Sequence, residues 1–86
     1  MPLKRILVID DDEVDRISIR RALKQAYKNP YIIEADNGEE GIKQITTEEF
    51  DCVFLDYLLP DMDGVSLLKK VFDKNLDTAP LPIIML

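Results

Sequence analysis

Three carboxylates that follow two short apolar runs are the residues of this chain best suited to chemistry. Asp10 and Asp11 come directly after the apolar run at residues 6–9. Asp56 comes directly after a second apolar run at residues 52–55. If the runs are neighbouring strands, about 4.8 Å apart, the three side chains converge on one pocket. A hard divalent cation such as Mg²⁺ would then offset the repulsion between carboxylates, about 1 kcal/mol per pair in water and several-fold more near protein.

The composition is that of one small, acidic domain. The chain has 86 residues, of which 47% are hydrophobic and 33% charged, and its net charge is -6. The negative charge argues against a nucleic-acid or anionic-membrane surface on this segment, and no apolar run reaches membrane-spanning length. The single cysteine, Cys52, is expected to be a small buried hydrophobe, and with no disulfide framework we expect a cytoplasmic location without a signal peptide. The absence of histidine excludes a catalytic histidine and a histidine-based zinc site on this chain.

The elements that must position the carboxylates alternate between strands and helices. Apolar runs predict four strands, at residues 6–9, 31–33, 50–55 and 82–86. Helices are predicted between them, with Asp12 capping the first and Asn37 beginning the second. Pro30 and the early change to charged residues indicate that the second strand lies at a sheet edge. The methionine and aromatic side chains, other than Met62 in its loop, are expected in the core.

This alternation predicts an α/β fold. Strands that alternate with helices require a parallel sheet with right-handed crossovers and helices on both faces. We expect a flavodoxin-like doubly wound parallel sheet with the element order βαβαβαβ and the strand order 2-1-3-4. In that order the first and third strands are neighbours at the switch point where such sheets bind ligands. This is the geometry that a shared site for Asp10, Asp11 and Asp56 needs.

Three stretches of the sequence together resemble a two-component response regulator receiver domain. They are ILVIDDD at residues 6–12, VFLDYLLPDMDG at residues 53–64, and LPIIML at residues 81–86. The resemblance spans the whole chain with matching spacing. It implies a phosphoacceptor signalling domain that takes a phosphoryl group from a sensor histidine kinase or a phosphotransfer protein. Such a domain accepts the group on itself and turns over no separate substrate.

The resemblance also assigns roles to individual residues. Asp56 would be the phosphoacceptor, and Mg²⁺ would be held by Asp10, Asp11, Asp56 and the backbone carbonyl of Leu58. A backbone ligand explains why an apolar side chain is acceptable at Leu58. The assignment agrees with the chemistry, because phosphoryl transfer depends on positioning and on cationic stabilisation more than on covalent chemistry. A bound phosphoryl group would add about two negative charges to the carboxylates, a perturbation suited to switching.

The resemblance further implies segments that this sequence does not contain. A receiver domain carries a Ser or Thr after its fourth strand and a Lys after a fifth, whereas the last lysine here is Lys74. We therefore expect residues 1–86 to be a receiver domain that is incomplete at its C-terminus, without the fourth helix, the fifth strand and the fifth helix. The strand at residues 83–86 would then be an exposed edge, so self-association or domain swapping through it is expected.

Two other functions stay open on the residues alone. An Asp10-x-Asp12 pair after an apolar strand also resembles the first motif of haloacid-dehalogenase-type phosphatases, with Asp10 as nucleophile and Asp12 as general acid. That reading leaves Asp56 unexplained. The other alternative is a receiver-like interaction module that binds partners without phosphorylation. Asp61 and Asp63 are expected to be loop and helix-capping residues rather than metal ligands.

Overall fold

The computed structural model describes residues 4–74 and 81–86, which form three helices and one four-stranded sheet. The elements are β1 (Arg5–Ile9), α1 (Glu13–Ala26), β2 (Tyr31–Ala35), α2 (Gly38–Thr47), β3 (Cys52–Leu55), α3 (Gly64–Lys74) and β4 (Ile83–Met85). Each predicted strand differs from the observed one by at most two residues at either end. The predicted alternation of strands and helices is therefore confirmed.

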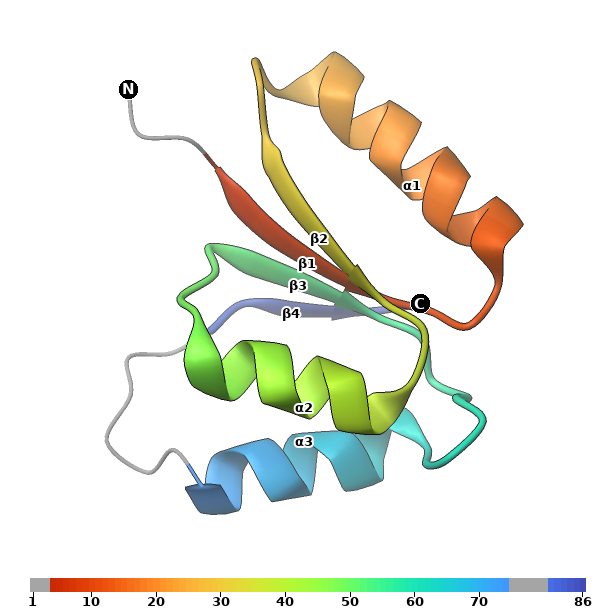
Figure 1. Ribbon diagram of the computed structural model, residues 1–86, viewed down its shortest axis with the longest axis vertical. Helices are drawn as coiled ribbons and strands as arrows, with labels where there is room; N and C mark the ends of the chain where they lie inside the picture. Colours follow the sequence, from red (N-terminus) through yellow and green to blue (C-terminus); the bar gives the residue numbers. More distant parts are fainter. Residues whose placement is uncertain (1–3, 75–80) are drawn as a thin grey trace.

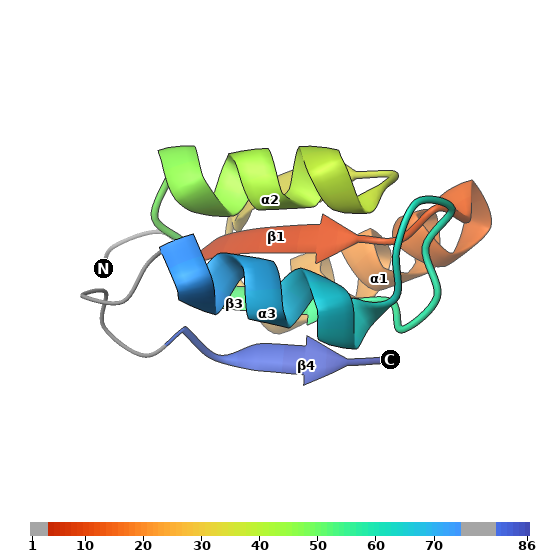
Figure 2. The same cartoon turned by 90° about the horizontal axis from the view of Figure 1, so that it is seen from below.

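All neighbouring strands are parallel, and their order is β2-β1-β3-β4 (Figure 1). The predicted order 2-1-3-4 and the edge position of β2 are thus confirmed. Figure 2 shows that the arrowheads of β1 and β4 point toward the same side of the molecule. The carboxyl ends of all the strands consequently meet at one edge of the sheet, which is where open parallel sheets place their ligand sites.

The central strand β1 is buried on both faces. Leu7 and Ile9 point to one face, where they join a core cluster that includes residues of α2 and α3. Ile6 and Val8 point to the other face, where they pack against Leu23 of α1. This two-sided burial explains why the strand reads as an uninterrupted apolar run rather than as an alternating pattern. It also fixes the strand end from which the first carboxylates extend.

Asp12 caps the first helix as predicted, and Asn37, where the sequence predicts the turn into the second helix, caps that helix. The Asp12 carboxylate accepts a hydrogen bond from the Val14 amide at the start of α1. The Asn37 side chain accepts one from the Glu40 amide at the start of α2. Both side chains satisfy amides that have no partner within their own helix. Within residues 4–74 and 81–86, no helix has the length and apolar character needed to cross a membrane.

The prediction that aromatic and methionine side chains belong to the core is wrong for several of them. Tyr27, Tyr57, Phe72 and Met85 are exposed, whereas Met62 packs against the core. Phe72 follows buried Val71 on α3, and neighbouring residues of a helix point about 100° apart, so Phe72 turns away from the core. Cys52 is a free cysteine, as expected, but it is half-buried rather than fully buried.

Candidate functional site

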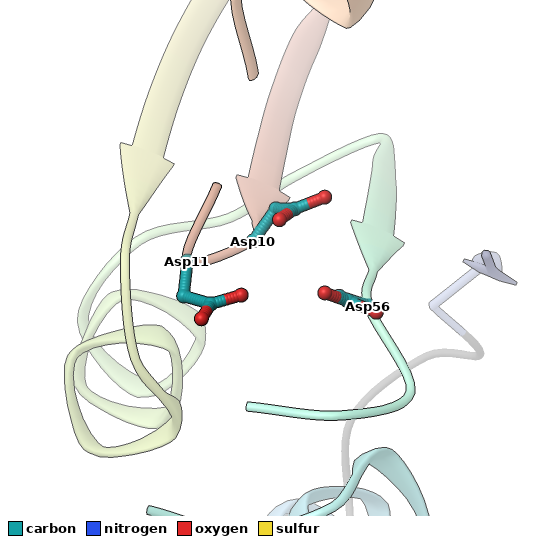
Figure 3. Close-up of side chains that lie close together, drawn as sticks. All are labelled: Asp10, Asp11 and Asp56. Carbon is teal, nitrogen blue, oxygen red and sulfur yellow. The ribbon is translucent and has the colours of Figure 1, made fainter. Parts of the chain in front are cut away.

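The three predicted carboxylates gather at the carboxyl ends of two neighbouring strands. Ile9, the last residue of β1, pairs with Leu55, the last residue of β3. The next residue of each chain segment is an aspartate, Asp10 or Asp56, and Asp11 follows the first of them. Each side chain offers a carboxylate oxygen, and these oxygens lie within 4.8 Å of one another (Figure 3). The predicted convergence of Asp10, Asp11 and Asp56 is therefore observed.

Backbone hydrogen bonds hold two of these carboxylates at the sheet edge. The Asp56 amide donates to the Ile9 carbonyl at 2.9 Å, and the Asp10 amide donates to the Ala35 carbonyl at 3.0 Å. These bonds extend the sheet ladder by one residue beyond the strands. The Asp12 amide in turn donates to Oδ1 of Asp10 at 2.9 Å. The site is thus built on rigid backbone rather than on a free loop.

Burial and like charge both act on the carboxyl group of Asp10. Its residue is only 3% exposed. Burial raises the pKa of Asp10, and the negative charges of Asp56, Asp15 and Asp11 raise it further, whereas the hydrogen bond from the Asp12 amide lowers it. A buried carboxylate beside two others is costly unless a positive charge joins it. The cluster is therefore an electrostatic site that favours a cation.

The donor set fits a hard divalent cation. All three side chains offer carboxylate oxygens, and the cluster contains neither imidazole nor thiolate. Oxygen-only ligands suit Mg²⁺ rather than zinc or copper. Exposure rises from buried Asp10 through half-buried Asp56 to exposed Asp11, so the cluster opens to solvent on one side. Asp10, Asp11 and Asp56 could hold Mg²⁺ and leave that side free for water or for phosphate oxygens.

The loop between β3 and α3 keeps its own backbone bonds beside the cluster. The Leu58 amide donates to Oδ1 of Asp56 at 3.3 Å, and the Gly64 amide donates to the Tyr57 carbonyl at 2.6 Å. Leu58 also forms an isolated antiparallel bridge with Asp63, and its own side chain is exposed. These hydrogen bonds hold the loop after Asp56 in a defined turn beside the cluster. The backbone-carbonyl ligand assigned to Leu58 stays a prediction.

The other two aspartates of this loop cap helices, as predicted. The Asp61 carboxylate accepts hydrogen bonds from the Gly38 amide at 2.7 Å and from the Glu39 amide at 2.9 Å. The Asp63 carboxylate accepts one from the Ser66 amide at 2.7 Å. These backbone bonds lower the pKa of both carboxyl groups. Asp61 therefore links the loop after Asp56 to the start of α2.

Asp12, the general acid of the phosphatase alternative, is not part of the cluster. Its carboxylate accepts from the Val14 amide as the N-cap of α1. The carboxylates that converge are those of Asp10, Asp11 and Asp56. Asp56, which the phosphatase alternative does not explain, is thus a member of the site. Asp12, which that alternative requires as general acid, caps α1 instead.

The chain is similar in sequence to known response regulators and to proteins that share their receiver domain. The sequence profile of the response regulator receiver domain matches residues 6–86. The chain is 38% identical to the response regulator MprA of Mycolicibacterium vanbaalenii, in a match that covers 100% of this chain and 35% of that protein. It is 37% identical to a protein-glutamate methylesterase/protein-glutamine glutaminase of Pseudoalteromonas atlantica, in a match that covers 94% of this chain and 20% of that protein. The chain thus spans only a fifth to about a third of the length of these relatives.

Solved structures agree with this placement. The response regulator TrrA of Thermotoga maritima, determined in complex with Mg²⁺-BeF, matches with a TM-score of 0.81 at 31% identity, over 96% of this chain and 68% of that one. TrrA has also been determined in complex with the histidine kinase ThkA, with a TM-score of 0.79 to this chain, 31% identity, and coverage of 96% and 67%. The profile, the relatives and the strand order all point the same way. The chain belongs to the response regulator receiver domain family of two-component systems.

Proposed function

We propose that this chain accepts a phosphoryl group on Asp56, with Mg²⁺ held by Asp10, Asp11, Asp56 and the backbone carbonyl of Leu58. The observation that carries the proposal is the convergence of the three carboxylates, whose oxygens lie within 4.8 Å of one another. A structural ion pair does not explain this cluster, because none of the ion pairs among residues 4–74 and 81–86 involves the Asp10, Asp11 or Asp56 carboxylate. A bound divalent cation would offset the repulsion among the three carboxylates, which gives the cluster a physical reason to bind one.

The positions of the side chains give each a part in the transfer. Asp56 is half-buried, so a phosphoryl donor can approach it from solvent. The hydrogen bond from the Leu58 amide to Oδ1 fixes the rotation of the Asp56 carboxylate. An Asp56 carboxylate oxygen attacks the phosphorus in line, so that an O–P bond forms while the N–P bond of the donor's phosphohistidine breaks and the leaving imidazole takes up a proton from solvent. Mg²⁺ supplies, when bound, positive charge for the equatorial phosphoryl oxygens.

The protein partner that we propose for this chemistry is a phosphohistidine donor. The complex of TrrA with the histidine kinase ThkA supports a sensor histidine kinase as the partner, and a phosphotransfer protein offers the same chemistry. We place this exchange in the cytoplasm, in keeping with a single free cysteine. The chain itself would be the acceptor, so it would turn over no separate substrate.

A small phosphodonor tests the proposal. The protein is incubated with acetyl phosphate and Mg²⁺, and its intact mass is then measured. We expect the mass to rise by one phosphate group in the wild type and to stay unchanged in Asp56→Asn. The control is Asp12→Asn, which alters an exposed acidic residue outside the cluster and keeps a capping side chain, so it should still be modified. Phosphate uptake that persists in Asp56→Asn would contradict the assignment.

The edge strand β4 supports a second proposal, on assembly. Within the described ranges β4 pairs with β3 alone, and Ile84, Met85 and Leu86 are exposed. We propose that residues 1–86 correspond to the β1–β4 part of a receiver domain, since the chain covers 68% of the solved TrrA chain, and that this isolated part self-associates by pairing or swapping β4.

Sedimentation at rising protein concentration tests the assembly. We expect dimers or larger species for the 86-residue chain, and a shift toward monomer in Ile84→Lys, because a charged side chain on an edge strand opposes pairing. The control is Val14→Lys, which places the same charge on another exposed apolar residue, on α1 and away from β4. A monomer that melts cooperatively at all concentrations would refute the proposal.

A further inference from the structure

Arg16 is a basic side chain that reaches the backbone of the acidic site. It lies on α1, directly after the turn that carries Asp10 and Asp11. Its Nη1 donates a hydrogen bond to the carbonyl oxygen of Asp10 at 2.6 Å. That carbonyl lies just past the last pairing residue of β1, at the point where the chain leaves the sheet. Arg16 thus contacts the backbone of the residue that supplies the buried carboxylate.

A second contact holds the guanidinium in this position. Arg16 Nε donates to Oε1 of Glu34 on β2 at 3.1 Å. The other oxygen of that carboxylate, Oε2, accepts from Nη1 of Arg20, one helical turn further along α1. Both oxygens of Glu34 are therefore engaged, and the planar guanidinium of Arg16 is fixed between β2 and the Asp10 carbonyl. Such a two-point contact needs the forked geometry of arginine.

The two arginines share the contact with Glu34 but differ in their contact with the acidic site. Both form an ion pair with Glu34 and so fasten α1 to β2. Arg16 alone contacts Asp10, and its side chain is 17% exposed against 38% for Arg20. A purely structural ion pair requires only the contact with Glu34. The contact with the Asp10 carbonyl is therefore the part of the arrangement that reaches the acidic site.

We propose that Arg16 is a positioning residue for the cation site, because it fixes the backbone from which the Asp10 and Asp11 carboxylates extend. Repulsion within the cluster pushes these carboxylates apart and would displace the turn between β1 and α1. The bond to the Asp10 carbonyl opposes this displacement and brings a positive charge to the turn. The inference deepens the proposed function and rests on the Mg²⁺ site proposed there.

Two arginine variants separate positioning from stability. Arg16→Met and Arg20→Met each remove one ion pair with Glu34, and each should lower the melting temperature, Arg16→Met by more because it also removes the bond to the Asp10 carbonyl. Only Arg16→Met should weaken Mg²⁺ affinity, by about 10-fold or more, as is usual when a side chain that orients a metal ligand is lost. Calorimetric titration with MgCl₂ measures the affinity. Equal affinities in the two variants would overturn the inference.

Two further measurements separate the geometry of the Arg16 side chain from its charge and from Mg²⁺ binding. Arg16→Lys keeps the charge but cannot bridge Glu34 and the Asp10 carbonyl, so it should weaken Mg²⁺ binding nearly as much as Arg16→Met. Wild-type affinity in Arg16→Lys would mean that charge alone matters, and would overturn positioning. In the metal-free protein, the Asp12 amide, which donates to Oδ1 of Asp10, should exchange its hydrogen faster in Arg16→Met than in Arg20→Met.

The metal-free readout also separates the two proposals. A wild-type protein that binds no Mg²⁺ would contradict the proposed function, whereas a difference in Asp12 amide exchange between the two variants would still support the positioning role. Wild-type binding of Mg²⁺ with unchanged affinity and unchanged Asp12 exchange in Arg16→Met would contradict the positioning role alone.

Discussion

Asp10→Asn is expected to make the metal-free protein more stable at neutral pH while it removes most of the Mg²⁺ affinity. The Asp10 side chain is buried beside Asp56 and Asp11, so its negative charge is destabilising without a cation. Asparagine has the same shape and keeps an oxygen that accepts from the Asp12 amide. The substitution therefore removes repulsion, of the order of 1 kcal/mol or more per close carboxylate pair, without removing the hydrogen bond.

The pH dependence of this effect has a defined sign. Burial raises the pKa of Asp10 above its ordinary value of 3.8. The folded protein then binds the Asp10 proton more tightly than the unfolded chain does. In the wild type, the contribution of protonated Asp10 to stability is therefore complete below pH 3.8 and is lost as the pH rises through the raised pKa. The stability advantage of Asp10→Asn should accordingly grow with pH across that window and then become constant.

Denaturant unfolding with and without Mg²⁺ measures both effects. In EDTA the midpoint for Asp10→Asn should lie above that of the wild type at pH 7. Saturating Mg²⁺ should raise the wild-type midpoint and leave that of the variant nearly unchanged. The matched control is Asp12→Asn, which removes a charge outside the cluster and should respond to Mg²⁺ like the wild type. A metal-free Asp10→Asn protein that is less stable than the wild type would contradict this account of the cluster.

Leu67→Ala is expected to cost about 2 to 5 kcal/mol of unfolding free energy, the range for truncation of a buried leucine. Leu67 lies on α3 and is 0% exposed. It belongs to the core cluster that joins α3 to β1, β3 and α2. Since small domains are stable by only about 5 to 15 kcal/mol, this loss is a large part of the total. The helix that follows the loop after Asp56 would then pack poorly.

Leu58→Ala is the control for that prediction, because the same substitution is made where no packing is lost. The Leu58 side chain is 69% exposed, so its truncation should change the free energy of unfolding by less than about 0.5 kcal/mol. Urea unfolding followed by circular dichroism measures both variants. Similar midpoints for Leu67→Ala and Leu58→Ala would mean that α3 contributes little to the core, contrary to its burial.

The sequence by itself determined the elements and the central site of this protein. Local patterns are sufficient for the elements, because a short apolar run predicts a strand and a capping residue marks the start of a helix. The topology of parallel sheets then places the residues that follow two neighbouring strands at one edge. This is why Asp10, Asp11 and Asp56 could be grouped although 46 residues separate the first from the last.

Only the tertiary structure decided what surrounds that site. The Asp61 carboxylate caps α2 from 23 residues away, and Arg16 joins the Asp10 carbonyl to Glu34 on another strand. Gly41 lets α2 approach β1 closely, since a Cβ there would lie 2.6 Å from Cδ1 of Ile9, which would have to move. Such contacts join residues that no local pattern connects, and they depend on the distance between packed elements. These contacts therefore depend on how the helices pack on the two faces of the sheet, which the sequence pattern alone does not give.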